Sequence, residues 1–92
     1  MEIRNNSAMR RFEMMSGENV AFVEYDKKGD RVTLTHTEVP KALSGQGVGS
    51  KLAQGVLDQL RADGAKVVPR CEFVAAFVKR HPEYSDLIVE ES

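Results

Sequence analysis

The sequence predicts one α/β domain over residues 1–92, in which an antiparallel β-meander leads into a β-α-β unit and a second helix. Short polar turns separate the first apolar runs, and residues 31–39 alternate in the way a strand does. At Val48 the apolar spacing changes from two residues to that of a helix. A chain of 92 residues is of the size expected for a single domain.

The first half of the chain is expected to form a three-stranded meander. Its strands are predicted at Arg10–Met15, Val20–Tyr25 and Arg31–Val39. Between them, Ser16–Asn19 and Asp26–Asp30 carry the glycine and polar residues typical of tight turns. Because these connections are short, neighbouring strands should pair antiparallel.

The second half is expected to form a helix, a strand and another helix. The first helix is predicted by the apolar residues Val48, Leu52, Ala53, Val56, Leu57 and Leu60, and by Asp63-Gly64 as its end. Ala65–Pro69 is a short apolar strand, which the crossover helix should place parallel to Arg31–Val39. Cys71–His81 is the second helix, with Phe73, Val74, Phe77 and Val78 expected to face inward, and the tail after Pro82 could add a turn or a short strand.

Composition narrows the classes of function. The formal net charge of −1 argues against nucleic acid or an acidic membrane surface as the main partner. No run approaches the ~20 apolar residues of a membrane span, and the first residues do not have the pattern of a signal peptide. The single cysteine, Cys71, excludes an internal disulfide and a cysteine metal cluster, and it suits the reducing cytoplasm.

Three alternating glycines, Gly45, Gly47 and Gly49, lie between the third predicted strand and the first helix. A helix start offers unpaired N–H groups, and glycines let the backbone approach a ligand, so this loop suits a phosphate or pyrophosphate. The order Gly49-Ser50-Lys51 does not match a Walker A loop, and G-x-G-x-G is not the dinucleotide fingerprint G-x-G-x-x-G. A loop that merely needs tight turns is the alternative.

The stretch Ser44–Gly49 resembles the pyrophosphate loop of the GNAT (GCN5-related) acetyltransferases, Arg/Gln-x-x-Gly-x-Gly/Ala, with Ser44 in place of Arg or Gln. Over a wider range, His36–Leu52, Cys71 and His81–Ile88 are similar to the minimal, single-domain GNAT proteins. The resemblance covers most of the chain from about Ala21 onward. It implies an abbreviated GNAT core, acetyl-CoA as cosubstrate and no metal.

The resemblance also implies which residues hold acetyl-CoA. Backbone amides of Gln46–Ser50 would bind the pyrophosphate, and the strand Thr37–Val39 would bond the peptide-like pantetheine arm. The expected binding residues are Thr37, Val39, Ser44, Gly45, Gln46, Gly47, Val48, Gly49, Ser50 and Lys51. For Lys51, a solvated surface charge is at least as good an interpretation.

Cys71 is a candidate nucleophile. It falls at the predicted start of the second helix and beside Arg70, where negative charge on sulfur would be stabilised. Such a sulfur could accept the acetyl group and pass it on by a ping-pong route. A small, buried apolar residue is the competing interpretation of a lone cysteine.

His36 and Glu38 are candidate acid-base residues. Alternation places them on one strand face, which they are expected to share with Val32 and Leu34. A histidine can act as general base near neutral pH, and a carboxylate could orient it or take its proton through water. Alternatively, His36 merely ends an apolar face.

The preferred function is transfer of an acetyl group from acetyl-CoA to an amine, by a monomer or weak dimer. The acceptor is either an amine of a protein or a small amine, and the sequence does not say which. A non-catalytic CoA-binding sensor or interaction module is the second hypothesis, and Ser44 is the departure that supports it. A small interaction domain with a purely structural glycine loop is the third.

Overall fold

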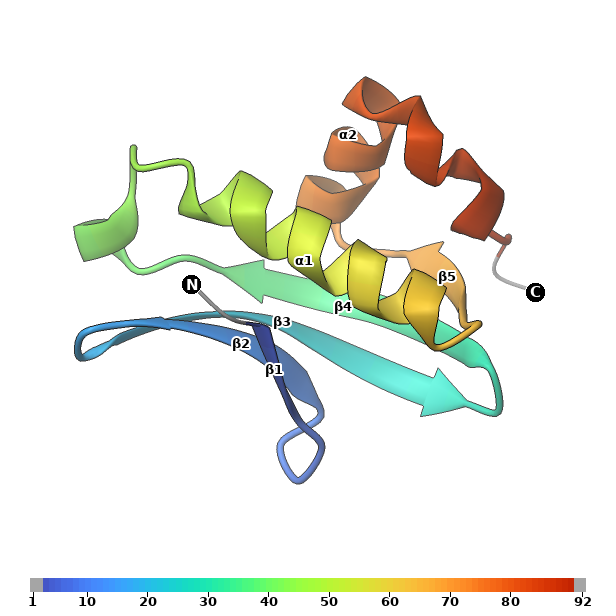
Figure 1. The fold of residues 1–92 in the computed structure, drawn as a ribbon, viewed down its shortest axis with the longest axis horizontal. Coiled ribbons are helices and arrows are strands. Elements are labelled where there is room, and N and C mark those ends of the chain that lie inside the picture. Colours follow the sequence, from blue (N-terminus) through green and yellow to red (C-terminus); the bar gives the residue numbers. More distant parts are fainter. Residues whose placement is uncertain (1–2, 91–92) are drawn as a thin grey trace.

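The computed structural model describes residues 3–90, and its centre is a five-stranded sheet whose strands lie in chain order (Figure 1). The strands are β1 (Ile3–Asn6), β2 (Arg11–Ser16), β3 (Asn19–Lys28), β4 (Arg31–Glu38) and β5 (Lys66–Pro69). The first four pair antiparallel, and β5 pairs parallel to β4. The predicted meander, the β-α-β unit and the α/β class are therefore confirmed.

Two α-helices lie on the same side of this sheet, and the opposite face carries no helix among residues 3–90 (Figure 1). The helices are α1 (Val48–Ala62) and α2 (Glu72–Arg80), and the short 3-10 helices are η1 (Lys41–Leu43) and η2 (Pro82–Leu87). Each α-helix presents one apolar face, as its helical spacing predicts. None of the helices in the described range is long and apolar enough to cross a bilayer.

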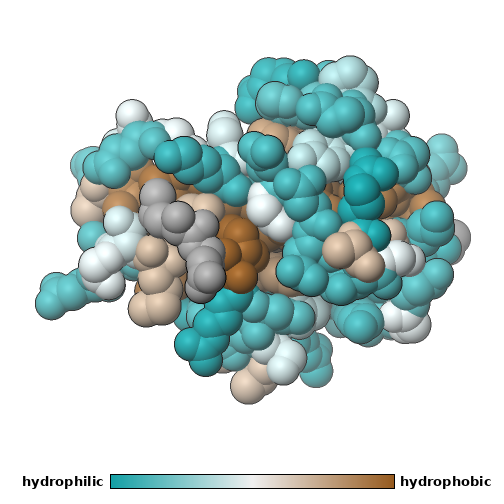
Figure 2. Space-filling view, in the orientation of Figure 1, coloured by the Kyte–Doolittle hydropathy of each residue, from teal (hydrophilic) through white to brown (hydrophobic). Residues whose placement is uncertain are grey.

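The hydrophobic core fills the space between the sheet and the helices. On α1 it contains the six residues predicted from spacing, and on the sheet it contains Val23, Leu34 and Val67, each fully buried. Figure 2 shows mainly hydrophilic residues over the outside, with hydrophobic side chains between them in the middle of the molecule. Of the inward set expected on the second helix, Val74 and Phe77 are buried and Val78 is partly buried. Phe73 is 37% exposed, so its expected inward position is wrong.

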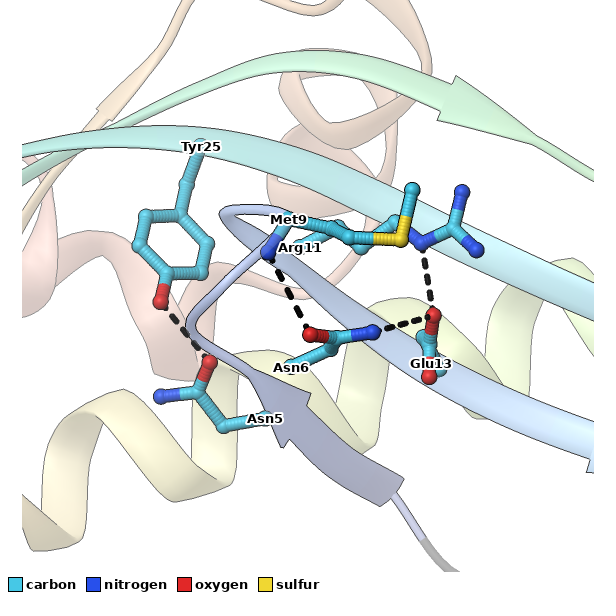
Figure 3. A network of polar contacts seen from close by, with 6 residues as sticks. All are labelled: Asn5, Asn6, Met9, Arg11, Glu13 and Tyr25. Atoms are coloured by element: carbon cyan, nitrogen blue, oxygen red, sulfur yellow. Dashed lines mark hydrogen bonds and ion pairs between the residues drawn. The ribbon is translucent and has the colours of Figure 1, made fainter.

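The sequence predicts three strands in the meander, whereas the structure has four. The additional strand is β1. Its residues carry no clear alternation, and polar contacts hold it in place (Figure 3). The Tyr25 hydroxyl donates to Asn5 Oδ1 at 2.7 Å, and Asn6 Nδ2 donates to Glu13 Oε2 at 3.1 Å. Arg11 Nε also donates to Glu13 Oε2, at 2.6 Å, and this bond lowers the pKa of the buried Glu13 carboxyl. The partners of Asn5 and Asn6 lie on β3 and β2, outside the strand itself, so local pattern does not reveal β1.

A β-bulge in β4 changes which face its last residues occupy. Pairing with β3 joins Tyr25 to Leu34 but Glu24 to His36, so Thr35 is an extra residue on β4. The alternation beyond Leu34 is thereby shifted by one residue. The expectation that His36 and Glu38 share a face with Val32 and Leu34 is therefore wrong.

The tail after α2 folds back onto the sheet. η2 follows α2, and Ile88 then forms a parallel bridge with Val67 of β5, in agreement with the turn or short strand expected there. The Tyr84 hydroxyl donates to Asp58 of α1 at 2.8 Å, and burial together with this carboxylate raises the pKa of Tyr84 to about 12. Arg61 of α1 pairs with Asp86 at 2.8 Å, which completes the link between α1 and the tail.

Candidate functional site: the glycine loop and the end of β4

A cavity of about 270 Å³ lies between the glycine loop, the first turn of α1 and the start of α2. Its lining consists of Val39, Leu43, Ser44, Gly45, Gly47, Val48, Gly49, Ser50 and Phe73. Seven of these nine residues belong to the acetyl-CoA-binding set expected from the sequence. The fold therefore gathers the glycine loop around a hollow, as a ligand-binding loop requires.

The structure requires glycine at the three positions of the loop for two different reasons. Gly45 and Gly47 have φ of 81° and 72°, a left-handed conformation that other residues adopt at a cost. Gly49 lies inside the first turn of α1, where a Cβ would approach the Phe73 ring to 2.8 Å. Gly49 thus allows α2 to pack against the start of α1, while Gly45 and Gly47 shape the loop.

The start of α1 has the features of an anion site. Gly47 is the N-cap residue and supplies no side-chain bond to the helix, so the amides of Val48, Gly49 and Ser50 have no partner within the helix. The first turn contains no acidic residue that would compete with a bound anion. The helix dipole adds partial positive charge at the same point. Backbone amides alone can therefore hold a phosphate here.

Two residues of the expected binding set point elsewhere. Gln46 folds its side chain back, and Nε2 donates to the Ala42 carbonyl at 3.4 Å. The Lys51 backbone amide donates to Gly47, and its side chain lines a separate hollow together with Ile3 and Gln54. The structure therefore does not bring the Lys51 side chain to the glycine-loop cavity.

Cys71 lies where β4 and β5 diverge. Their pairing ends at Leu34 and Pro69, and the Cys71 amide then donates to the Leu34 carbonyl at 2.9 Å. The half-buried Cys71 thiol donates to the Thr37 hydroxyl at 3.2 Å. Cys71 is also the N-cap residue of α2, as expected for a helix start. The thiol thus lies between the two strands, next to the part of β4 that extends beyond β5.

His36 and Glu38 lie on the sheet face opposite the helices. Thr37 pairs with the buried Val23 and contacts Cys71, so its two neighbours point the other way. Both side chains are exposed, and the His36 ring lies 6.3 Å from that of Phe22. The two residues share a face, as predicted, but the bulge separates them from Cys71 by the thickness of the sheet.

Phe73 and Thr35 are two site residues outside the set expected from the sequence. Phe73 fits the helical spacing of a core residue, yet it lines the glycine-loop cavity. Thr35 carries the bulge, and only its pairing with β3 reveals this. The small residue Gly49, opposite an aromatic ring on the next helix, is the one sequence signal that could have pointed to Phe73.

Comparison with known families agrees with this arrangement. Residues 11–87 match the family described as GCN5-related N-acetyl-transferase. The chain belongs to this family. The match includes β2 to η2, and hence the glycine loop, Cys71 and both helices.

Relatives of this chain include the proteins named NATD1. The human and cattle proteins are each 35% identical over 63 residues, which is 67% of this chain and 56% of theirs. The zebrafish protein is 33% identical over 72 residues, 75% of this chain and 66% of its own length. The matched part of the chain thus spans little more than half the length of the mammalian relatives.

A solved structure supports the same fold. The solution NMR structure of a GCN5-like protein from Staphylococcus aureus is 26% identical, with a TM-score of 0.73. The alignment covers 99% of this chain and 90% of that one. The abbreviated core of the GCN5-related family is therefore shown for the whole described chain.

Proposed function

We propose that this protein binds acetyl-CoA at the glycine loop and transfers the acetyl group to an amine. The observation that carries the proposal is the cavity that the first turn of α1, whose first amides have no partner within the helix, shares with Val39. Val39 is two residues along the chain from Thr37, which accepts the hydrogen bond from the Cys71 thiol. Membership of the GCN5-related family supports the same chemistry.

The chain offers a distinct group for each part of the cosubstrate. In our proposal the amides of Gln46–Ser50 bind the pyrophosphate, and the backbone of Thr37–Val39 bonds the pantetheine arm. Because β4 extends beyond the last residue paired with β5, its edge is open to a peptide-like partner there. Phe73 forms an apolar wall of the same cavity.

The transfer itself needs an amine that has lost its proton. The amine nitrogen attacks the thioester carbonyl, a C–N bond forms, the C–S bond breaks and CoA leaves as a thiol. We propose His36 as the base for an acceptor that approaches from the open face of the sheet, with Glu38 beside it. We place the protein in the cytoplasm, where Cys71 would stay reduced.

Incubation with acetyl-CoA decides between direct transfer and a route through Cys71. If the thiol accepts the acetyl group, intact mass will rise by one acetyl group in the original protein and stay unchanged in Cys71→Ser. Absence of the adduct, with amine acetylation intact, would establish direct transfer. Thr37→Val is the matched variant, because it keeps the Cys71 thiol but removes the hydroxyl that accepts its hydrogen bond.

A thermal-shift series tests the proposal as a whole. Acetyl-CoA and free CoA at ten times their dissociation constant should each add about 1.4 kcal/mol and raise Tm by roughly 5–10 °C, with little effect of ATP. CoA release with a panel of amines should follow. Binding without turnover would favour the CoA-binding module, and no shift at saturating CoA would refute both functions.

A further inference from the structure

Phe73 is the most exposed apolar side chain in the lining of the glycine-loop cavity. It is 37% exposed, and within residues 3–90 the other large hydrophobic side chains that are exposed are Met9 and Met15. Leu43 and Val48 also line the cavity, but both are buried in the core. The Phe73 ring is therefore the principal apolar surface that this cavity offers to a ligand.

The Phe73 ring is held against the first turn of α1. A Cβ at Gly49 would lie 2.8 Å from the ring atom Cζ, so the ring occupies the space that a side chain at Gly49 would need. Gly49 also supplies one of the amides without a partner within the helix, and Ser50 supplies the next. An aromatic ring and unpaired amides are thus neighbours in one cavity.

This combination suits a ligand in which an apolar group follows directly on a phosphate. In the pantetheine arm of CoA, a CH₂ group separates the phosphate ester oxygen from a carbon that bears geminal methyl groups. On the other side of the CoA pyrophosphate, the chain continues into a ribose that carries hydroxyl groups. The arm can therefore bury apolar atoms beside Phe73, whereas the nucleotide half would place polar atoms there.

The cavity also extends from the amides to β4. Val39, the residue that follows β4, lines it together with Ser50 and Phe73. Its volume of about 270 Å³ lies below the ~300–1,000 Å³ typical of pockets for drug-sized ligands, so it suits a part of CoA rather than the whole molecule. The part that could contact both the amides and the end of β4 is the phosphate end of the arm.

We propose that Phe73 determines which phosphate ligands the glycine loop binds, by packing against the geminal methyl groups of the pantetheine arm. The cavity then selects phosphopantetheine and its thioesters over nucleotides that carry a pyrophosphate without the arm. Gly49 contributes to this selection, because it leaves room for the ring beside the amides. The inference rests on the proposed binding of acetyl-CoA and adds the residue and the ligand feature that make this binding selective.

Chemical-shift titration with probes that contain different parts of CoA tests the selection. 4′-Phosphopantetheine carries the arm without adenosine, ADP carries a pyrophosphate without the arm, and acetyl-CoA carries both halves. 4′-Phosphopantetheine should bind the original protein at least about tenfold more tightly than ADP, because the methyl groups leave water at the Phe73 ring. In the same complex, nuclear Overhauser effects should connect the ring protons of Phe73 with these methyl groups.

Substitutions on α2 separate selection from folding. Phe73→Ala should weaken acetyl-CoA and 4′-phosphopantetheine at least about tenfold and change ADP binding less than about twofold, since only the arm contacts the ring. Phe73→Leu is the matched control, because it keeps an apolar side chain, and it should weaken the same probes less than about threefold. Val78→Ala, on the same helix but outside the lining, should lower Tm without changing the ratio of the affinities.

Three outcomes would overturn the inference and leave acetyl-CoA binding in place. The first is equal affinity of the original protein for 4′-phosphopantetheine and ADP. The second is equal weakening of both probes by Phe73→Ala, which would show that Phe73 merely supports the loop. The third is absence of the Overhauser effects in the saturated original protein, which needs no variant to fold. Failure of acetyl-CoA and 4′-phosphopantetheine to bind the original protein would instead refute the proposed function itself.

Discussion

Replacing Ser50 with aspartate is expected to weaken acetyl-CoA binding at least about 100-fold while the free protein stays as stable as before or becomes more stable. Ser50 is exposed, lines the glycine-loop cavity and lies in the first turn of α1. A carboxylate about 5 Å from a phosphate charge at an effective dielectric constant of ~20 is repelled by about 3 kcal/mol. That repulsion corresponds to more than a hundredfold in dissociation constant.

The same substitution should stabilise the free protein. A loss of acetyl-CoA affinity in Ser50→Asp would therefore not be caused by a loss of stability. An acidic residue in the first turn interacts favourably with the helix dipole, by about 0.3–1 kcal/mol, and α1 has none there. Calorimetric titration with acetyl-CoA and thermal unfolding of the free protein measure the two effects. Ser50→Asn is the control, since it has the same shape without the charge and should retain affinity within about threefold. Tight binding by Ser50→Asp would show that the pyrophosphate does not bind at the start of α1.

Replacing Met14 with alanine is expected to cost about 2–5 kcal/mol, whereas the same change at Met15 should cost less than about 1 kcal/mol. Met14 is 2% exposed and faces the core, where it pairs with Ala21 of β3 and Ile3 of β1. Met15 is 52% exposed. The two residues are adjacent and chemically identical, so only the strand face differs.

Thermal unfolding measures this pair directly. A loss of 2–5 kcal/mol should lower Tm by roughly 10–20 °C or more in a domain of this size, and the Met15 variant should unfold within a few degrees of the original. Equal losses at Met14 and Met15 would contradict the register of β2. Acetyl-CoA added to each folded variant should still raise its Tm, because neither residue lines the glycine-loop cavity.

Much of the fold follows from local pattern. The spacing of Val48, Leu52 and Val56 predicts α1, because a helix must bury one face to be stable. Turn residues predict the hairpins, and the crossover helix predicts the parallel pairing of β5. The glycine loop is also visible in the sequence, since positive φ at Gly45 and Gly47 requires glycine. These features depend on residues that are close together in the chain, so they can be recognised from the sequence alone.

The arrangement of the candidate site depends instead on contacts between distant residues. Pairing with β3 places the bulge at Thr35, which moves His36 and Glu38 to the open face. Packing of α2 on α1 turns Phe73 toward Gly49 rather than into the core, and polar contacts hold β1 without an apolar pattern. The sequence by itself thus determined the elements, their order and the loop that suits an anion. Only the tertiary structure decided which face of the sheet each side chain occupies and which residues line the glycine-loop cavity, because register and helix packing are set by the whole core.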